Sequence, residues 1–500
     1  MTGGFLGPGA TWFLGAYLVS LIAIGWLGRR ARRDEGLADF FLAGRGMGLA
    51  TLFLTLYATQ YSGNALVGFP ANAYRQGFLF LNAITFMVGI VGVYWLFAPR
   101  LQRLAAARAY LTPGDLVRDR FGDRTLVAVL NVVFVVVLAS YILANLKAVG
   151  QVLEAVTGGG IGFATAVWFA AFIMVVYESL GGMRSVAWTD AIQGMLLLAG
   201  CIVIFLALDA RFGGFALFLD QLATVRPEFW EPPGAGALAG WASVIIVIAF
   251  GAAVYPQALQ RIFAARDGRT LKRSFQLMLL MPLVTITLVL AIGLAGAAAF
   301  PGLDRAGSEG ITLALLGDLV EAIPALRWLF VLFLAAAVAA IMSTVDSALL
   351  TISSIFTQDV YRRWRPATPE AELTRAGKWF SWGTMALAAM LAIYLPQTIW
   401  KLTVVKLEVL CQAAPAIICA VQAQRPAARP VLLGLLAGLA VVLGLKLLAG
   451  LGMFPSDAPL GIEGGAWGLA VNVTVLAALG RRYRRTDRQT TKSSAPTSIG

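Results

Sequence analysis

Apolar residues occur along almost the whole chain in blocks of about 20, and short polar segments separate the blocks. A block of this length can cross the hydrocarbon core of a bilayer as a single helix. The pattern therefore predicts an all-α polytopic membrane protein with about thirteen transmembrane helices. Their predicted limits are 10–28, 46–70, 77–98, 125–148, 161–180, 188–209, 240–258, 274–300, 327–357, 377–396, 402–423, 430–450 and 466–480.

Charged residues divide between alternate predicted loops. Basic groups run from Arg29 to Arg33, from Arg261 to Arg273 and from Arg481 to Arg488, whereas acids such as Glu309 and Glu463 lie in the opposite loops. Because cytoplasmic loops are enriched in lysine and arginine, the N-terminus should lie outside and the C-terminus in the cytoplasm. An even number of spans would place basic loops on both sides of the membrane.

Composition narrows the possible functions. The chain is 59% hydrophobic and 13% charged, which leaves no sizeable soluble domain. Its net charge of +13 lies in short loops, so it reflects topology and no nucleic-acid partner is expected. The chain has no histidine, which excludes a Ser-His-Asp triad and an H-E-x-x-H zinc site, and we do not expect an enzyme. An arginine- and alanine-rich chain without organelle signals indicates a bacterial plasma membrane.

A polar run interrupts the second predicted span, LYATQYSGNALVG at 56–68. It contains Gln60, Ser62, Gly63 and Asn64 near the middle of the span. Backbone that leaves the helix is tolerated in a membrane only where it is buried in protein or lines a wet cavity, as in the broken helices of transporters. A polar contact between intact helices, made by small residues, would also explain the run. The run alone does not decide between these interpretations.

Two further stretches carry polar groups inside apolar spans. Residues 335–359, AAAVAAIMSTVDSALLTISSIFTQD, place Ser343, Thr344 and Asp346 in one span. Hydroxyl and carbonyl oxygens can bind sodium, although serine and threonine can also bond back to their own helix. Residues 177–194, YESLGGMRSVAWTDAIQG, contain Thr189 and Asp190, either of which could simply cap a helix.

Four stretches together resemble the sodium/solute symporter family, which includes sodium-coupled proline, pantothenate and sugar transporters. They are FFLAGRGMGLATLFLTLYATQYSGNALVGFPANAYRQG at 40–77, SLGGMRSVAWTDAIQG at 179–194, YPQALQRIFAARD at 255–267 and AAIMSTVDSALLTISSIFTQDVYRR at 339–363. The resemblance extends over the second to the eleventh predicted span.

This resemblance implies a LeuT-type fold with a five-plus-five inverted-repeat core and broken helices. The second span would be the first broken helix, and FGAAVYPQ at 250–257, with Gly251 and Pro256, would interrupt its counterpart. The implied organisation is a first span and cytoplasmic loop at 1–45, a first repeat at 46–209, a second repeat at 240–424, two peripheral spans at 430–482 and a disordered cytoplasmic tail at 483–500.

The resemblance also implies an ion site, with sodium as the coupling ion. The family's sodium ligands correspond to the carbonyls of Ala58, Tyr61 and Ala340 and to the hydroxyls of Ser343 and Thr344. Asp190 matches an aspartate on the inner sodium path. One position departs from the family pattern, because sodium–proline transporters carry an acid where this chain has Gln60.

The solute is expected between the two breaks, near Gln60, Ser62, Gly63, Asn64, Tyr255 and Gln257. Lys147 is a further candidate, because a cation within a span is costly and marks a functional site by default. It could instead extend to the outer interface, or pair with Glu408, and Lys406 could take that second role. A contact between Lys147 and the solute would favour a carboxylate.

The sequence therefore predicts a sodium-coupled secondary active importer of a small organic solute, a carboxylate or zwitterion, working by alternating access. Its expected partners are the solute, sodium and the lipid bilayer, with no obligate protein partner. Proton coupling is the alternative within transport, and Asp190, Asp346 or Glu408 would then carry the proton. A membrane sensor with a transporter-like bundle is a second alternative, but only a short polar segment follows the last predicted span.

Overall fold

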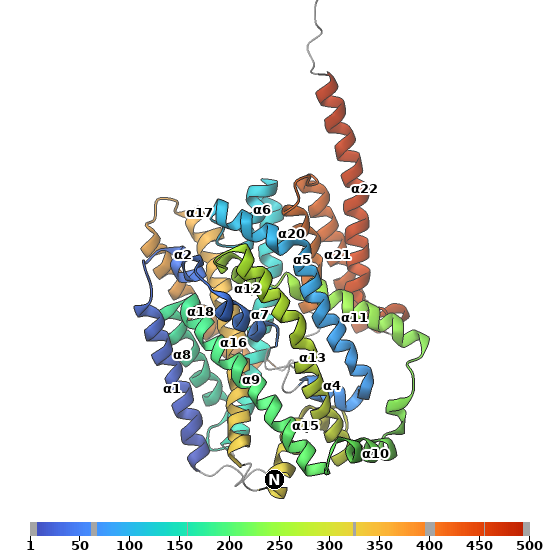
Figure 1. Ribbon diagram of the computed structural model, residues 1–500. Coiled ribbons are helices and arrows are strands. Elements are labelled where there is room, and N and C mark those ends of the chain that lie inside the picture. The colour runs from blue at the N-terminus through green and yellow to red at the C-terminus, as the bar shows by residue number, and fades with distance from the viewer. Residues whose placement is uncertain are drawn as a thin grey trace, which may run out of the picture.

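The computed structural model describes residues 8–61, 68–157, 159–323, 327–395, 406–454 and 456–493. The regular structure of these residues is helical, with one isolated parallel bridge between Met47 and Ala265. Most long helices run side by side between two ends of the molecule (Figure 1). The predicted all-α class is confirmed.

The helices used below are α1 Pro8–Arg30, α2 Leu37–Leu42, α3 Leu49–Gln60, α4 Gly68–Gln76, α5 Asn82–Arg108, α6 Pro113–Phe121, α7 Arg124–Val156, α8 Phe163–Gly181, α9 Met183–Phe212, α10 Phe215–Val225, α11 Ala235–Ala253, α12 Pro256–Ala264, α13 Gly268–Ala299, α15 Ile311–Ala322, α16 Arg327–Ile355, α17 Arg362–Trp364, α18 Glu370–Tyr394, α20 Ala414–Ala420, α21 Ala428–Gly450 and α22 Gly464–Ser493.

Every predicted span contains helix within the described residues. Seven of these helices are long and apolar enough to cross a membrane, and eight if the bent pair α11 and α12 counts as one span. Helix α3 is a shorter apolar helix of 12 residues, and α4 belongs to the candidate span Gly68–Arg108. The chain is thus a multi-pass membrane protein, and the count of thirteen spans stays a prediction.

Both predicted breaks involve local features of the sequence. Helix α3 ends at Gln60, and Tyr61 leaves the helical conformation with φ −105° and ψ 74°. Helix α11 ends at Ala253, and α12 starts at Pro256 after a bend of 50°. Proline is well suited to the first position of a helix, because it has no N–H to be left unpaired and its φ is already helical. The helix of the second span therefore ends where its polar run begins, and the helix of its counterpart ends shortly before Pro256.

Gly251 does not interrupt the helix as the sequence suggested, since it lies inside α11. A Cβ atom at this position would come within 2.9 Å of the carbonyl oxygen of Leu407. The glycine therefore allows α11 to approach the helical segment 406–410 closely.

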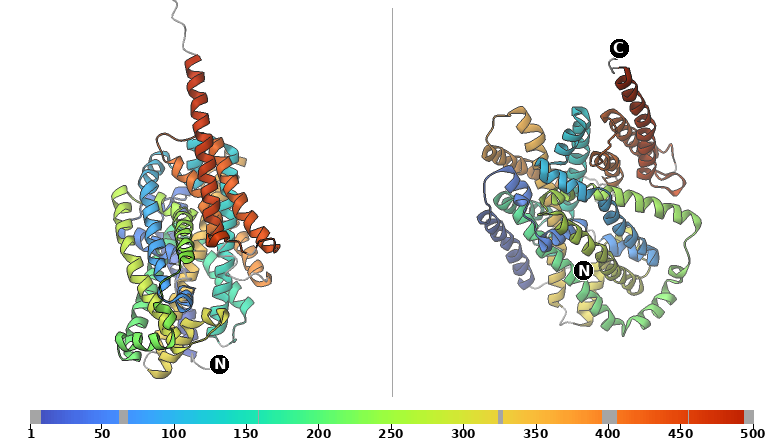
Figure 2. Two further views of the ribbon diagram at one scale, coloured as in Figure 1. Left: turned by 90° about the vertical axis from the view of Figure 1, so that its right-hand side faces the viewer. Right: turned by 45° about the horizontal axis from the view of Figure 1, so that its top comes forward.

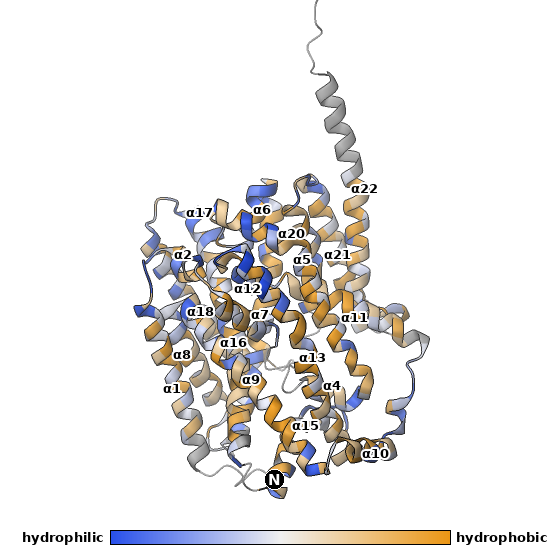
Figure 3. Cartoon of the chain, viewed as in Figure 1, coloured by the Kyte–Doolittle hydropathy of each residue, from blue (hydrophilic) through white to orange (hydrophobic). Residues whose placement is uncertain are grey.

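The loop charges separate in space as well as in sequence. Helices α2, α6 and α17 lie at the upper end of the molecule, and α10 and α15 at the lower end (Figure 1). Helix α17 carries Arg362 and Arg363, α6 carries two arginines and two aspartates, and α10 and α15 carry acids but no basic residue. Hydrophilic positions accordingly gather at the upper end, while the middle of the bundle is mostly hydrophobic (Figure 3). Which end faces the cytoplasm stays a prediction.

Helices α21 and α22 pack against each other and lie along one flank of the bundle (Figure 2). Helix α22 also contacts α11. It continues to Ser493, whereas the sequence predicts that the last span ends near 480 and that a disordered tail starts at 483.

A short backbone bridge joins the two broken spans at the upper end. The amide of Met47, which precedes α3, donates to the carbonyl of Ala264 at 3.1 Å. The amide of Arg266, which follows α12, donates to the carbonyl of Met47 at 3.1 Å. The beginning of α3 and the end of α12 are thus tied together.

Candidate functional site

Three of the predicted sodium ligands share one turn of α16. The hydroxyls of Ser343 and Thr344 both donate to the carbonyl of Ala340, at 3.0 and 3.2 Å, and all three residues are buried. This is the back-bonding that the sequence left open. Each hydroxyl oxygen still has lone pairs with which to bind a cation, because donating uses only its hydrogen. The turn therefore presents three oxygens in a buried place.

The other two predicted ligands, Ala58 and Tyr61, lie at the end of α3. Both are buried, and α3 packs against α16. Carbonyls in the last turn of a helix have no partner in the next turn, so that of Ala58 is suited to accept a cation. The phenol oxygen of Tyr61 is buried with no hydrogen-bond partner among the described residues. The five predicted ligands thus belong to two helices in contact, and their coordination of sodium stays a prediction.

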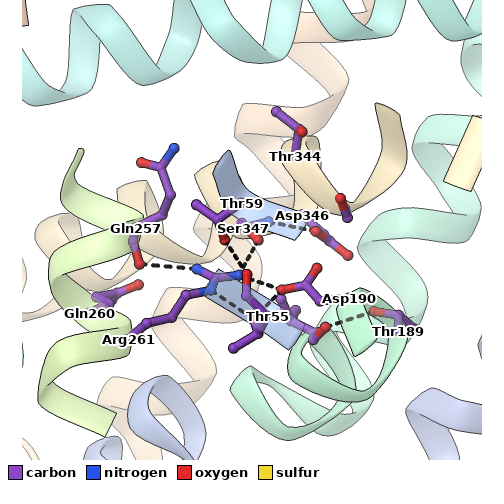
Figure 4. A network of polar contacts seen from close by, with 12 residues as sticks. Thr55, Thr59, Thr189, Asp190, Gln257, Gln260, Arg261, Thr344, Asp346 and Ser347 are labelled. Atoms are coloured by element: carbon purple, nitrogen blue, oxygen red, sulfur yellow. Dashed lines mark hydrogen bonds and ion pairs between the residues drawn. The ribbon is translucent and has the colours of Figure 1, made fainter. Parts of the chain in front are cut away.

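Asp190 lies inside α9 and is completely buried. It is therefore not a helix cap, because α9 begins two turns earlier at Met183. Its Oδ2 atom accepts hydrogen bonds from the hydroxyl of Thr55 and from Nη2 of Arg261, the latter at 2.5 Å (Figure 4). Its Oδ1 atom is buried without a partner in the described part of the chain. One carboxylate oxygen is thus engaged and the other is uncommitted.

Arg261 is the residue that sequence reasoning placed wrongly. The charge pattern groups it with the loop residues, yet it is fully buried in α12. Its Nε donates to the hydroxyl of Thr55 at 2.7 Å, its Nη1 to the carbonyl of Gln257 at 3.0 Å, and its Nη2 to the hydroxyl of Ser347 at 2.6 Å (Figure 4). With Asp190, these contacts join α3, α9, α12 and α16. Its apolar neighbours Leu259 and Ile262 were the one local sign of burial.

A second buried carboxylate lies on α16. The hydroxyl of Tyr177 donates to the carboxylate of Asp346, and the amide of Ser347 donates to its Oδ1 at 2.6 Å. Tyr177 belongs to α8, so this contact fixes α8 against α16. Because Ser347 also bonds to Arg261, the two carboxylate sites form one network.

The residues predicted to line the solute site are only partly described. Ser62, Gly63 and Asn64 lie outside the described residues. The side-chain Nε2 of Gln60 donates to the hydroxyl of Tyr94 at 2.7 Å. The side chain of Gln257 points away from the guanidinium of Arg261 (Figure 4), and its Oε1 is buried with no partner in the described ranges.

Tyr255, at the break before α12, stacks on Tyr141 of α7, with ring centroids 5.7 Å apart and an interplanar angle of 11°. This contact brings the second break against the middle of α7. Sequence reasoning did not identify Tyr141, which is one of several aromatic residues in apolar spans.

Lys147 has a structural partner. Its ammonium donates to the carbonyl of Leu395, the residue that ends α18. A cation at the C-terminus of a helix is favourable, because the last carbonyls lack partners and carry partial negative charge. The suggested pair between Lys147 and Glu408 is wrong, since Glu408 binds Lys446 of α21 at 2.7 Å. Neither lysine proposed for that pairing is needed to neutralise Glu408.

Known proteins give an independent view of the chain. The family model SSF: Sodium:solute symporter family matches residues 40–438. The sodium/pantothenate symporter of Escherichia coli (strain K12) is 28% identical over 391 residues, which cover 76% of this chain and 77% of that protein. The high-affinity proline transporter PutP of Bacillus subtilis (strain 168) is 26% identical, and the match covers 69% of this chain and 73% of that protein.

A solved structure shows the same fold. The substrate-bound, outward-open structure of a Na+-coupled sialic acid symporter superimposes with a TM-score of 0.79, covering 95% of this chain and 98% of that one at 18% identity. This confirms the LeuT-type core with five-plus-five inverted repeats and broken helices. Because the family model matches most of its length, the chain belongs to the sodium:solute symporter family. It is therefore a sodium-coupled transporter and not an enzyme.

Proposed function

We propose that this chain imports a small organic carboxylate, an anion or a zwitterion, by sodium-coupled alternating access. The observation that carries the proposal is the buried turn of α16 with Ala340, Ser343 and Thr344. Helix α16 packs against α3, which ends at Gln60. A cation held by Ala58, Tyr61 and this turn would join the broken helix to α16. Sodium then favours one arrangement of the two helices, and the solute adds free energy that favours closure.

The proposed route for sodium passes Asp190. Its uncommitted Oδ1 atom offers a negative oxygen in a buried place, while Oδ2 remains bound to Arg261. A passing cation can therefore be stabilised without breaking the ion pair. Sodium coupling agrees with the family, and we do not propose the proton-coupled alternative.

The proposed solute site lies between the breaks, at Gln60, Ser62, Gly63, Asn64, Tyr255 and Gln257. The names of the relatives above contain pantothenate, proline and sialic acid, and each of these compounds carries a carboxylate. We propose the same class here. The proposed architecture consists of repeats at 46–209 and 240–424. In the proposed topology, the chain lies in a bacterial plasma membrane with its N-terminus outside the cell and its C-terminus in the cytoplasm.

The test uses purified protein in proteoliposomes with an imposed inward sodium gradient. Labelled pantothenate, L-proline and N-acetylneuraminate serve as probes, and thermal stability with and without sodium is measured in parallel. We expect sodium to raise the stability and to drive uptake of at least one probe. Ser343→Ala and Thr344→Ala should each weaken the response to sodium by roughly 1–3 kcal/mol, the cost of a lost buried partner.

Ser353→Ala is the matched control, because this buried serine lies on α16 but bonds to the carbonyl of Gly377 at 2.8 Å. It should respond to sodium as the wild type does. If Ser343→Ala and Thr344→Ala keep the sodium response of the control, the ion site lies elsewhere. If sodium neither stabilises the wild type nor drives uptake, the proposed function is wrong.

A further inference from the structure

A second buried lysine lies near the middle of the bundle. Lys406 starts the helical segment 406–410, and only 6% of its surface is exposed. Its ammonium lies 3.6 Å from the centre of the Tyr141 ring. Among the described residues, no ion pair includes Lys406. The nearby acid on its own segment, Glu408, is already bound to Lys446 at 2.7 Å.

The position of this ammonium is set by the aromatic pair. Tyr141 lies near the middle of α7, a helix that is long and apolar enough to cross the membrane. Its ring stacks on Tyr255, the residue at the break between α11 and α12. The ammonium, the two rings and the break thus meet far from both ends of α7. Gln257, with its unpaired Oε1, follows on the first turn of α12.

A lysine at this depth needs an anion, water or an acidic side chain, because hydrocarbon does not solvate an ammonium. The Tyr141 ring compensates for part of this cost through the attraction between a cation and the face of an aromatic ring. A carboxylate would give a much stronger partner, a hydrogen-bonded ion pair. The arrangement therefore has a place for an anion that the described chain does not supply.

We propose that Lys406 binds the carboxylate of the transported solute, while Tyr141 and Tyr255 pack against its body. The inference rests on the proposed function, because it assumes that an organic solute enters between the breaks. Gln257 adds a second requirement: its unpaired oxygen accepts a hydrogen bond, so the solute carries a hydroxyl, amide or ammonium donor. The solute class is thus a monocarboxylate with a hydrogen-bond donor on its body.

This assignment differs from the one that the sequence favoured. Lys147 lies six residues beyond Tyr141, about 9 Å further along α7. Its ammonium bonds to the end of α18, which is a structural role. Lys406, in contrast, contacts the aromatic pair at the break itself.

The experiment measures binding to the full chain in saturating sodium, by thermal stabilisation. The probes are L-lactate, pantothenate, L-proline and N-acetylneuraminate, each beside its own methyl ester, which lacks the negative charge. We expect at least one acid to stabilise the wild type where its ester does not. Lys406→Met should weaken apparent binding of that acid at least tenfold and still be stabilised by sodium. Lys406→Arg should recover part of the affinity, because it restores the charge in a larger and planar group.

Lys272→Met, which changes an exposed lysine on α13, is the control and should bind the acid as the wild type does. Wild-type affinity in Lys406→Met would overturn the proposal. A wild type that prefers no acid over its ester would also overturn it, and this measurement does not depend on whether a variant folds. In either case, if sodium still stabilises the wild type, the proposed sodium coupling stands. If sodium does not stabilise the wild type, the result counts against the proposed function instead.

Discussion

The buried pair of Arg261 and Asp190 should stabilise the fold only as a pair. Arg261→Met removes a guanidinium that is fully buried and leaves Asp190 as an uncompensated charge. Asp190→Leu has the converse effect on Arg261. Breaking a buried ion pair by removing one partner costs about 3–5 kcal/mol, because the remaining charge has lost both water and its counter-ion.

The double variant, Arg261→Met with Asp190→Leu, should be less destabilised than the sum of the single variants. Both charges are gone, and the remaining loss is four hydrogen bonds at about 0.5–1 kcal/mol each. Arg261 donates three of them, to Thr55, Ser347 and the carbonyl of Gln257, and Thr55 donates the fourth to Asp190. We therefore expect a total loss of about 2–4 kcal/mol and an interaction energy of at least 2 kcal/mol between the two positions.

The assay is unfolding of the purified protein by SDS in mixed micelles, followed for the wild type, both single variants and the double variant. Arg266→Met is the control, because this arginine is exposed and pairs with the exposed Asp267, and its stability should stay near that of the wild type. An interaction energy below about 1 kcal/mol would refute the reasoning, since two groups that act independently give additive losses. It would mean that water reaches the pair.

Three further predictions follow from the packing and the charge pattern. In a cysteine-free background, Glu309→Cys should react only with a reagent added outside and Gly268→Cys only from inside, and labelling of the latter from outside would overturn the proposed orientation. Lys147→Met should lower thermal stability by about 1 kcal/mol, because the contact at the end of α18 is lost. The Km for the solute should stay within twofold of the wild type, and a tenfold rise in Km would indicate that Lys147 binds the solute. Gly293→Ala should cost about 1–3 kcal/mol in SDS unfolding, because its Cβ would lie 2.4 Å from a side chain of α4, whereas Gly92→Ala meets open space and should not destabilise. Equal stability of these two variants would show that α4 and α13 separate without cost.

The helices could be predicted because their causes are local, whereas both breaks were expected from the resemblance to the family. Apolar blocks of membrane-spanning length mark the helices wherever the chain places them. The polar residues from Gln60 onward lie where α3 ends, and Pro256 lies where α12 begins. The hydroxyls of Ser343 and Thr344 could be noted from the sequence as polar groups in an apolar span, whereas Ala340 was added by the resemblance; all three share one helical turn.

The partners of the charged residues could not be predicted, because they come from other helices. Arg261 resembles a loop charge in sequence, and only its contacts with α3, α9 and α16 explain its burial. Glu408 finds Lys446 on α21, a helix that the pairing hypothesis did not consider. Lys147 bonds to a main-chain carbonyl, which no pattern of side chains reveals. Hydropathy indicates how far along a membrane-spanning helix a residue lies, but it does not indicate which face of the helix packs against a neighbouring helix.

The bridge at Met47 gives the two broken helices the form of a two-pronged fork. Its base is the pair of backbone hydrogen bonds, and its prongs are α3 and α12, about 18 and 14 Å long. The bond from Arg261 to Thr55 braces one prong against the other. A tilt of about 10° at the base would carry both tips, Tyr61 and Tyr255, through about 2–3 Å together. The proposed sodium and solute sites would then move together, because these hydrogen bonds tie the two helices to each other.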